Sequence, residues 1–225
     1  MSYTDQIPFI IPELVSNPEP RCACLLLLDT SSSMEGKAID ELNRGLQMFK
    51  QELLSDRMAT QRVEIGVVTF GPVKVLSDFH TADSFEPPVL VADGNTPMGA
   101  AIETGLDMLE ARKRTYKQAG ISYYRPWVFL ITDGAPSDDW RIAADRVRAG
   151  DNSDRKQFSF FAVGVEGADM ATLSLICSPN RPPLQLRGLS FRELFSWLSS
   201  SLGGVSRSQP GEAVNLPVPS GWASI

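Results

Sequence analysis

The hydrophobic pattern of this chain alternates between two kinds of segment. Short runs in which nearly every residue is apolar occur at 22–28, 63–70, 127–132 and 158–165, with a shorter one at 184–186. Such runs are typical of strands buried on both faces of a sheet. Between them, apolar residues recur at three- and four-residue steps, which predicts amphipathic helices at 39–53, 98–116, 138–149, 169–177 and 190–202.

This alternation of strands and helices predicts an α/β fold. We expect a Rossmann-like open twisted sheet of about six mostly parallel strands, with helices on both faces and the leucine-rich strand 25–28 at its centre. Gly71-Pro72 interrupts the second run, so 73–77 predicts one antiparallel edge strand. Residues 77–95 are rich in Asp, Pro and Gly and predict a long loop.

The length of 225 residues indicates one domain with an extension at each end. We predict an N-terminal arm over 1–19, the α/β domain over 20–203, and a tail rich in Gly, Ser and Pro over 204–225. Trp222 is the unusual residue of this tail. Two interpretations of it stay open: it packs back on the domain, or it is a contact for a partner protein.

Charge and composition narrow the classes of function. The formal net charge is −6 and the pI is about 4.9, which argues against binding to a nucleic-acid backbone. No apolar stretch approaches the ~20 residues that a membrane span needs, and the N-terminus resembles no secretion signal, so we expect a cytoplasmic protein.

Cys22 and Cys24 should lie on the same face of one strand. We expect their thiols to be buried and reduced, and a redox role is the alternative.

Oxygen-bearing side chains follow two of the predicted strands and precede one helix. Asp29, Ser31 and Ser33 come after the leucine run, Thr96 precedes the helix at 98, and Asp133 ends the third strand. The carboxyl ends of parallel strands gather ligands at one rim of the sheet, and hard cations such as Mg2+ prefer oxygen ligands. Each residue also has a structural alternative: the hydroxyls as helix caps, and Asp133-Gly134 as an ordinary turn.

The pattern Asp29-x-Ser31-x-Ser33, with Thr96 and Asp133 downstream, resembles the metal-ion-dependent adhesion site of von Willebrand factor type A domains. The resemblance covers residues 20–203. It implies that Ser31, Ser33 and Thr96 bind the metal directly, and that Asp29 and Asp133 bind it directly or through water. The metal implied is Mg2+, with Mn2+ and Ca2+ as alternatives.

Several segments are similar to one branch of that family. They are Cys-Ala-Cys before the leucine run, Gly-Asn-Thr-Pro-Met-Gly-Ala-Ala-Ile from residue 94, and Ile-Thr-Asp-Gly-Ala-Pro from residue 131. They resemble the TerY-type proteins of bacterial tellurite-resistance and stress-response clusters. That resemblance implies a scaffold working with kinase-like or phosphatase-like protein partners.

The function expected from these residues is therefore protein–protein interaction, in which an Asp or Glu of a partner completes the metal's ligand shell. No enzymatic activity is expected. The alternative is a Mg2+-dependent phosphohydrolase of the haloacid dehalogenase type, for which Asp29 would be the nucleophile and Asp138-Asp139 a late acidic pair. That chemistry needs a carboxylic acid two residues after the nucleophile, where this chain has Ser31.

Overall fold

The structure is a computed structural model that describes residues 14, 16–152, 154–219 and 221–224. Its centre is a seven-stranded sheet with the order β3-β2-β1-β4-β5-β6-β7. Neighbouring strands are parallel from β2 to β6, while β3 and β7 run antiparallel at the two edges. The strands are β1 (Cys22–Asp29), β2 (Val63–Phe70), β3 (Lys74–Thr81), β4 (Trp127–Thr132), β5 (Ser159–Gly164), β6 (Leu184–Leu186) and β7 (Ala223–Ser224).

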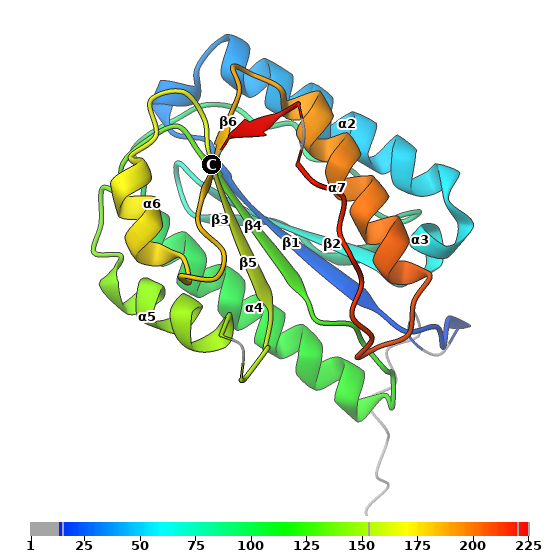
Figure 1. Cartoon of the computed structure of the whole chain (residues 1–225). Coiled ribbons are helices and arrows are strands. Elements are labelled where there is room, and N and C mark those ends of the chain that lie inside the picture. The colour runs from blue at the N-terminus through cyan, green and yellow to red at the C-terminus, as the bar shows by residue number, and fades with distance from the viewer. Residues whose placement is uncertain (1–13, 15, 153, 220, 225) are drawn as a thin grey trace, which may run out of the picture.

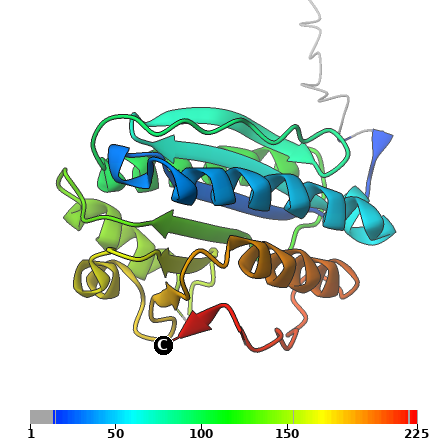
Figure 2. The same ribbon diagram turned by 90° about the horizontal axis from the view of Figure 1, so that it is seen from above.

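Helices cover both faces of this sheet, as Figure 1 shows. One layer holds α2 (Lys37–Ser55), α3 (Arg57–Arg62) and α7 (Phe191–Ser206); the other holds α4 (Met98–Gln118), α5 (Arg141–Gly150) and α6 (Met170–Ile176). A single 3-10 turn, η1 (Ser32–Met34), joins β1 to α2. Seen from above, in Figure 2, the parallel strands point toward the end of the sheet at which α2 begins, and β3 points the other way.

The side-chain alternation of β1 explains why both faces are covered. Cys22, Cys24, Leu26 and Leu28 belong to the core under α2 and α7, whereas Ala23, Leu25 and Leu27 belong to the core under α4, α5 and α6. Every residue of the strand is buried. An apolar residue is stabilising at each of these positions, because burial removes it from water on either face.

The predicted fold class is confirmed, with the leucine strand at the centre of the sheet. Four details differ from the prediction. A second antiparallel strand, β7, lies at the other edge of the sheet, where only the edge strand near 73–77 was expected. The sheet has seven strands rather than about six, α3 was not predicted, and β3 continues to Thr81 into the predicted loop. The strand continues because it pairs with β2 as far as Glu64, across a bulge that the sequence pattern does not reveal.

The C-terminal tail is part of the same body. The last helix continues to Ser206, so the predicted boundary at residue 203 falls inside α7. β7 then pairs with β6, and Trp222 is 1% exposed with its ring 5.4 Å from the Trp197 ring. Trp222 therefore packs back on the domain. Its side chain is buried and does not offer a surface contact to a partner protein. The predicted arm over 1–19 is described only from Leu14, without residue 15.

The cysteines are free and buried, as predicted for reduced thiols. Cys22 and Cys24 lie on the same face of β1, and burial, followed by the nearby Glu64 carboxylate, raises the pKa of Cys22 to about 12. Such a thiol is a poor nucleophile at neutral pH.

Among the described helices, none combines the length and hydropathy needed to span a bilayer.

Candidate metal centre

Asp29 is held at the carboxyl edge of the sheet by its own loop and by the neighbouring strand. It is the last residue of β1 and is fully buried. β1 and β4 run parallel with Leu28 opposite Ile131, so the next residues, Asp29 and Thr132, also meet. The Thr132 hydroxyl donates to Asp29 Oδ2 at 2.5 Å, and the Ser31 N–H donates to Oδ1 at 2.8 Å.

The remaining side chains predicted for the site surround this carboxylate. The Ser31 and Ser33 hydroxyl oxygens lie 3.0 Å apart, and the Ser33 hydroxyl donates to Asp133 Oδ1 at 2.7 Å. Thr96 Oγ1 lies close to Gly134, the residue after Asp133: a Cβ placed on Gly134 would be 3.5 Å from this oxygen. The structure thus brings all five predicted residues to one place, from three loops that are far apart in sequence.

The backbone of Gly94 joins the first two of these loops. Its carbonyl accepts hydrogen bonds from both the N–H (3.0 Å) and the hydroxyl (3.1 Å) of Ser32. Gly94 has φ +70°, and a Cβ there would lie 2.0 Å from the carbonyl oxygen of Gly71. Only glycine allows both this backbone conformation and this close approach.

Two residues that position Thr96 were missed by the sequence analysis. Ser137 exchanges hydrogen bonds with Thr96: its hydroxyl accepts from the Thr96 N–H at 3.1 Å, and its N–H donates to the Thr96 carbonyl at 2.9 Å. The Asp138 carboxylate accepts from the N–H groups of Gly99 (3.0 Å) and Ala100 (2.8 Å). Asp138 therefore caps α4 from another loop, and its predicted place at the start of the next helix is wrong.

The hydroxyls of the site do not act as helix caps, which was the structural alternative to metal binding. The residues in the N-cap positions of η1, α2 and α4 are Ser31, Gly36 and Pro97, and none makes a side-chain capping bond. Because Asp138 caps α4 instead, Thr96 is not needed for that role. The hydroxyls of Ser31, Ser33 and Thr96 consequently retain lone pairs for a ligand.

The electrostatics of the cluster favour a cation. Burial raises the pKa of Asp29; hydrogen bonds from Ser31 and Thr132 oppose this rise, and the neighbouring Asp133 carboxylate adds to it. In the described part of the chain no Lys or Arg forms an ion pair with Asp29 or Asp133, and no three His, Cys, Asp or Glu side chains gather as a metal cluster. Two carboxylates and three hydroxyls nevertheless form an all-oxygen set, which fits a hard divalent cation such as Mg2+.

Solved structures share this fold at low sequence identity. The proximal thread matrix protein 1 of the mussel byssus is 19% identical, with a TM-score of 0.56 over 83% of this chain and 49% of that chain. The pilus adhesin SpaC of Lactobacillus rhamnosus GG is 13% identical, with a TM-score of 0.65 over 84% of this chain and 31% of that one. The manganese-loaded TRAP protein of Plasmodium vivax is 17% identical, with a TM-score of 0.50 over 78% and 73%.

This chain spans about half the length of the mussel protein and about a third of the adhesin. No match was found among curated protein sequences. A family model, in contrast, matches residues 25–192, which include all five residues of the cluster. The chain belongs to the family of von Willebrand factor type A domains.

Proposed function

We propose that this protein is a metal-dependent protein–protein interaction module whose metal is held by Ser31, Ser33, Thr96, Asp29 and Asp133. The observation that carries the proposal is the convergence of these five side chains from three loops, with no basic side chain paired to either carboxylate in the described residues. The hydroxyls are the direct ligands. The carboxylates supply negative charge directly or through water.

A bound divalent cation supplies an electrophilic position that an outside anion can occupy. Hydroxyl ligands add no charge, so the cation retains its attraction for a carboxylate. Both oxygens of Asp29 already accept hydrogen bonds from the chain, so this carboxylate is suited to bind the metal through a water molecule. Ser33 is exposed and Asp133 half-buried, so an Asp or Glu of a partner approaches from their side.

Exposed apolar residues next to the site give such a partner further contact area. Val89 is 79% exposed and Val91 is 73% exposed, just before the loop that carries Thr96. The N–H of Asp93 donates to the Thr30 carbonyl at 2.7 Å, which holds this segment beside the first loop. A charged contact at the metal, surrounded by apolar contacts, is the usual arrangement of a protein interface.

Related structures support a divalent metal at this site. The mussel matrix protein was also solved with a zinc-occupied site of the same motif, and the Plasmodium vivax protein was solved with manganese. We propose Mg2+ for this chain because hydroxyls and water dominate the ligand set, with Mn2+ and Ca2+ as alternatives. The adhesin and matrix proteins among the neighbours are consistent with an interaction role rather than an enzymatic one.

The geometry gives the phosphohydrolase alternative no support. Asp29 is fully buried with both oxygens engaged, whereas a nucleophile needs an oxygen free to reach the phosphorus. Ser31, two residues after Asp29, carries a hydroxyl and not the carboxylic acid that this chemistry needs as its proton donor. Asp138 is occupied in capping α4.

The finer assignment rests on resemblance alone. We propose a cytoplasmic scaffold in a bacterial tellurite-resistance or stress-response system, with kinase-like or phosphatase-like partners. Its support is the similarity of the segments around Cys22, Thr96 and Asp133 to TerY-type proteins.

The test is affinity capture from cell extract with Mg2+ or with EDTA, read by mass spectrometry. Wild type should retain partners in Mg2+ that are lost in EDTA, and Asp29→Asn should lose the same proteins in both buffers. Asp139→Asn is the matched control, because Asp139 is an exposed aspartate of the adjacent loop and, among the described residues, its carboxylate accepts hydrogen bonds from Arg141 alone. Capture that is equally strong with and without EDTA would contradict the metal-dependent mechanism.

A further inference from the structure

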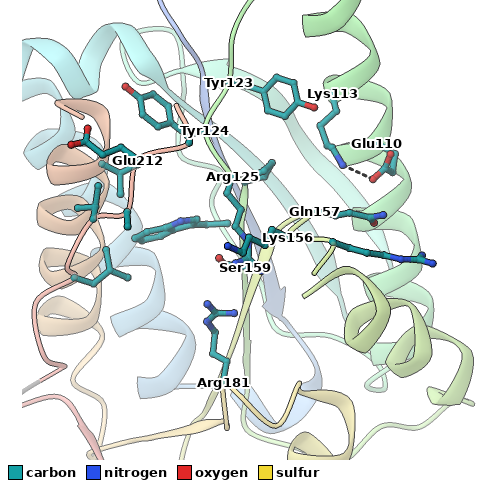
Figure 3. Close-up of a pocket in the computed structure, with 18 of the residues that line it drawn as sticks. Glu110, Lys113, Tyr123, Tyr124, Arg125, Lys156, Gln157, Ser159, Arg181 and Glu212 are labelled. Atoms are coloured by element: carbon teal, nitrogen blue, oxygen red, sulfur yellow. Dashed lines mark hydrogen bonds and ion pairs between the residues drawn. The ribbon is translucent and has the colours of Figure 1, made fainter. Parts of the chain in front are cut away.

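A second concave site lies at the opposite end of the sheet from the metal centre. It is a cavity of about 820 Å³ between the beginnings of β4 and β5, the end of α4, the loop at 155–157 and the C-terminal tail (Figure 3). Trp127 and Ser159, the first residues of β4 and β5, line it. The metal centre lies beyond the other end of β4: from Trp127 to Asp133 the strand rises about 20 Å at ~3.3 Å per residue.

The lining of this cavity is positively charged, although the whole chain has a net charge of −6. Among the described residues that line it, the acidic ones are Glu110 and Glu212. The six basic residues of the lining are Lys113, Lys117, Arg125, Arg155, Lys156 and Arg181. A concave surface lined by one sign of charge concentrates ions of the opposite sign.

Half of these six cations have an acidic partner, and the other three have none among the described residues. Lys113 pairs with Glu110 at 2.7 Å, as the dashed line in Figure 3 shows. Lys117, Arg155 and Lys156 are exposed, and they form no ion pair with any residue that the structure describes.

The two arginines share one acceptor. Arg125 Nη2 lies 2.9 Å from Asp151 Oδ1, and Arg181 Nη1 pairs with the same oxygen of this buried carboxylate. Burial lowers the pKa of Arg125; Asp151 opposes this effect and the positive charge of Arg181 adds to it. Two guanidinium groups thus lie beside a single carboxylate, with N–H donors left over. An additional anion would relieve this repulsion.

We propose that this cavity binds a small molecule that carries adjacent phosphate groups. Its volume lies within the range of small-ligand sites, roughly 300–1,000 Å³. Guanidinium groups match phosphate oxygens in a bidentate way, and the lysines add point charges. Several unneutralised cations on different walls suit a compact, multiply charged anion, whereas the net negative charge of the chain disfavours a long acidic polypeptide.

The first experiment titrates inorganic tripolyphosphate into the full chain by calorimetry. The buffer is freed of metals with a chelating resin, because EDTA is itself a polyanion and a metal ion would bring phosphate to the other site. We expect saturable binding by wild type, weakened at least tenfold in Lys117→Ala and in the double variant Arg155→Ala/Lys156→Ala. These side chains are exposed, so an unchanged melting temperature should show that each variant is folded.

Two controls separate this site from general charge effects and from the metal centre. Lys74→Ala removes an exposed lysine of β3 and should leave the affinity unchanged, as should Asp29→Asn at the metal centre. The proposal is overturned if tripolyphosphate does not bind, or if the cavity variants bind it as tightly as Lys74→Ala does. It is also overturned if a hexa-aspartate peptide binds more tightly than tripolyphosphate.

Discussion

At the scale of single residues, Asp29 combines burial with a negative charge that the described chain does not neutralise. Burial raises its pKa, so at neutral pH the ionised form costs stability when no metal is bound. The neutral Asp29→Asn side chain can keep both local hydrogen bonds, accepting from the Ser31 N–H and donating to the Thr132 hydroxyl. We therefore expect its metal-free melting temperature to equal or exceed that of wild type.

The same variant should lose its response to metal. A ligand that binds only the folded state adds RT ln(1 + [L]/Kd) to the free energy of unfolding and so raises the melting temperature. Thermal melts at increasing Mg2+ should shift upward for wild type and stay constant for Asp29→Asn. An equal Mg2+ shift in both proteins would place the metal elsewhere, and unfolding of the variant in the absence of metal would make Asp29 a structural residue.

The sequence was sufficient to predict which five oxygen-bearing side chains come together. Asp29, Ser31, Ser33 and Asp133 follow apolar runs, and Thr96 precedes a predicted helix. It was not sufficient for Ser137 and Asp138. Their contacts with Thr96, Gly99 and Ala100 join positions about 40 residues apart, and no local pattern encodes such a pairing.

At the scale of elements, the start of α4 depends on Asp138 in place of a local cap. Asp138→Ala leaves two N–H groups without their acceptor, which should cost about 1 kcal/mol in the free energy of unfolding. Because Thr96 precedes this turn, Mg2+ affinity should fall as well. Urea denaturation without metal and Mg2+ calorimetry measure the two effects.

Asp139→Ala is the control for Asp138→Ala. Its carboxylate is exposed, and within the described part of the chain it accepts hydrogen bonds from Arg141 alone, at the start of α5. It should leave Mg2+ affinity unchanged. Equal Mg2+ affinity for wild type and Asp138→Ala would show that the cap does not position Thr96.

Elements that depend on periodicity were predicted well, and those that depend on tertiary pairing were not. The buried strands β1, β2, β4 and β5 appear in the sequence as apolar runs. β7 has two residues and exists through its pairing with β6, in a segment whose composition suggests a free tail. α3 has six residues, too few for a periodic pattern to be recognised.

At the scale of the whole molecule, the tail closes the sheet edge beside β6. Trp222 is buried against Trp197, and its indole N–H has no acceptor among the described residues. Trp222→Ala should therefore lower the free energy of unfolding by about 3–5 kcal/mol. Trp222→Phe retains most of the packing and removes the unpaired N–H, so its loss should be much smaller.

Val218→Ala is the control for the tail. Val218 is 77% exposed, and its replacement should change stability by no more than about 0.5 kcal/mol. Chemical denaturation of the full chain compares these variants. A Trp222→Ala protein as stable as Val218→Ala would mean that the tail does not contribute to the core in solution.

The molecule as a whole separates two charged sites across one sheet. Oxygen ligands gather at the carboxyl ends of the strands and cations gather at the amino ends. The first cluster was predictable because three of its residues form the local motif Asp29-x-Ser31-x-Ser33 and the other two flank a predicted helix and strand. The second was not, because its basic residues come from α4 and from three separate loops, and none of these segments shows a binding motif by itself.

The most direct test of the central claim is a crystal structure of the protein soaked in Mn2+, with anomalous diffraction used to locate the metal. Mn2+ has the preference of Mg2+ for oxygen ligands and scatters anomalously. We expect the strongest anomalous peak to lie against the hydroxyl oxygens of Ser31, Ser33 and Thr96, and to be absent in Asp29→Asn crystals. A wild-type crystal with no peak at these hydroxyls, or with its strongest peak elsewhere on the chain, would contradict the assignment.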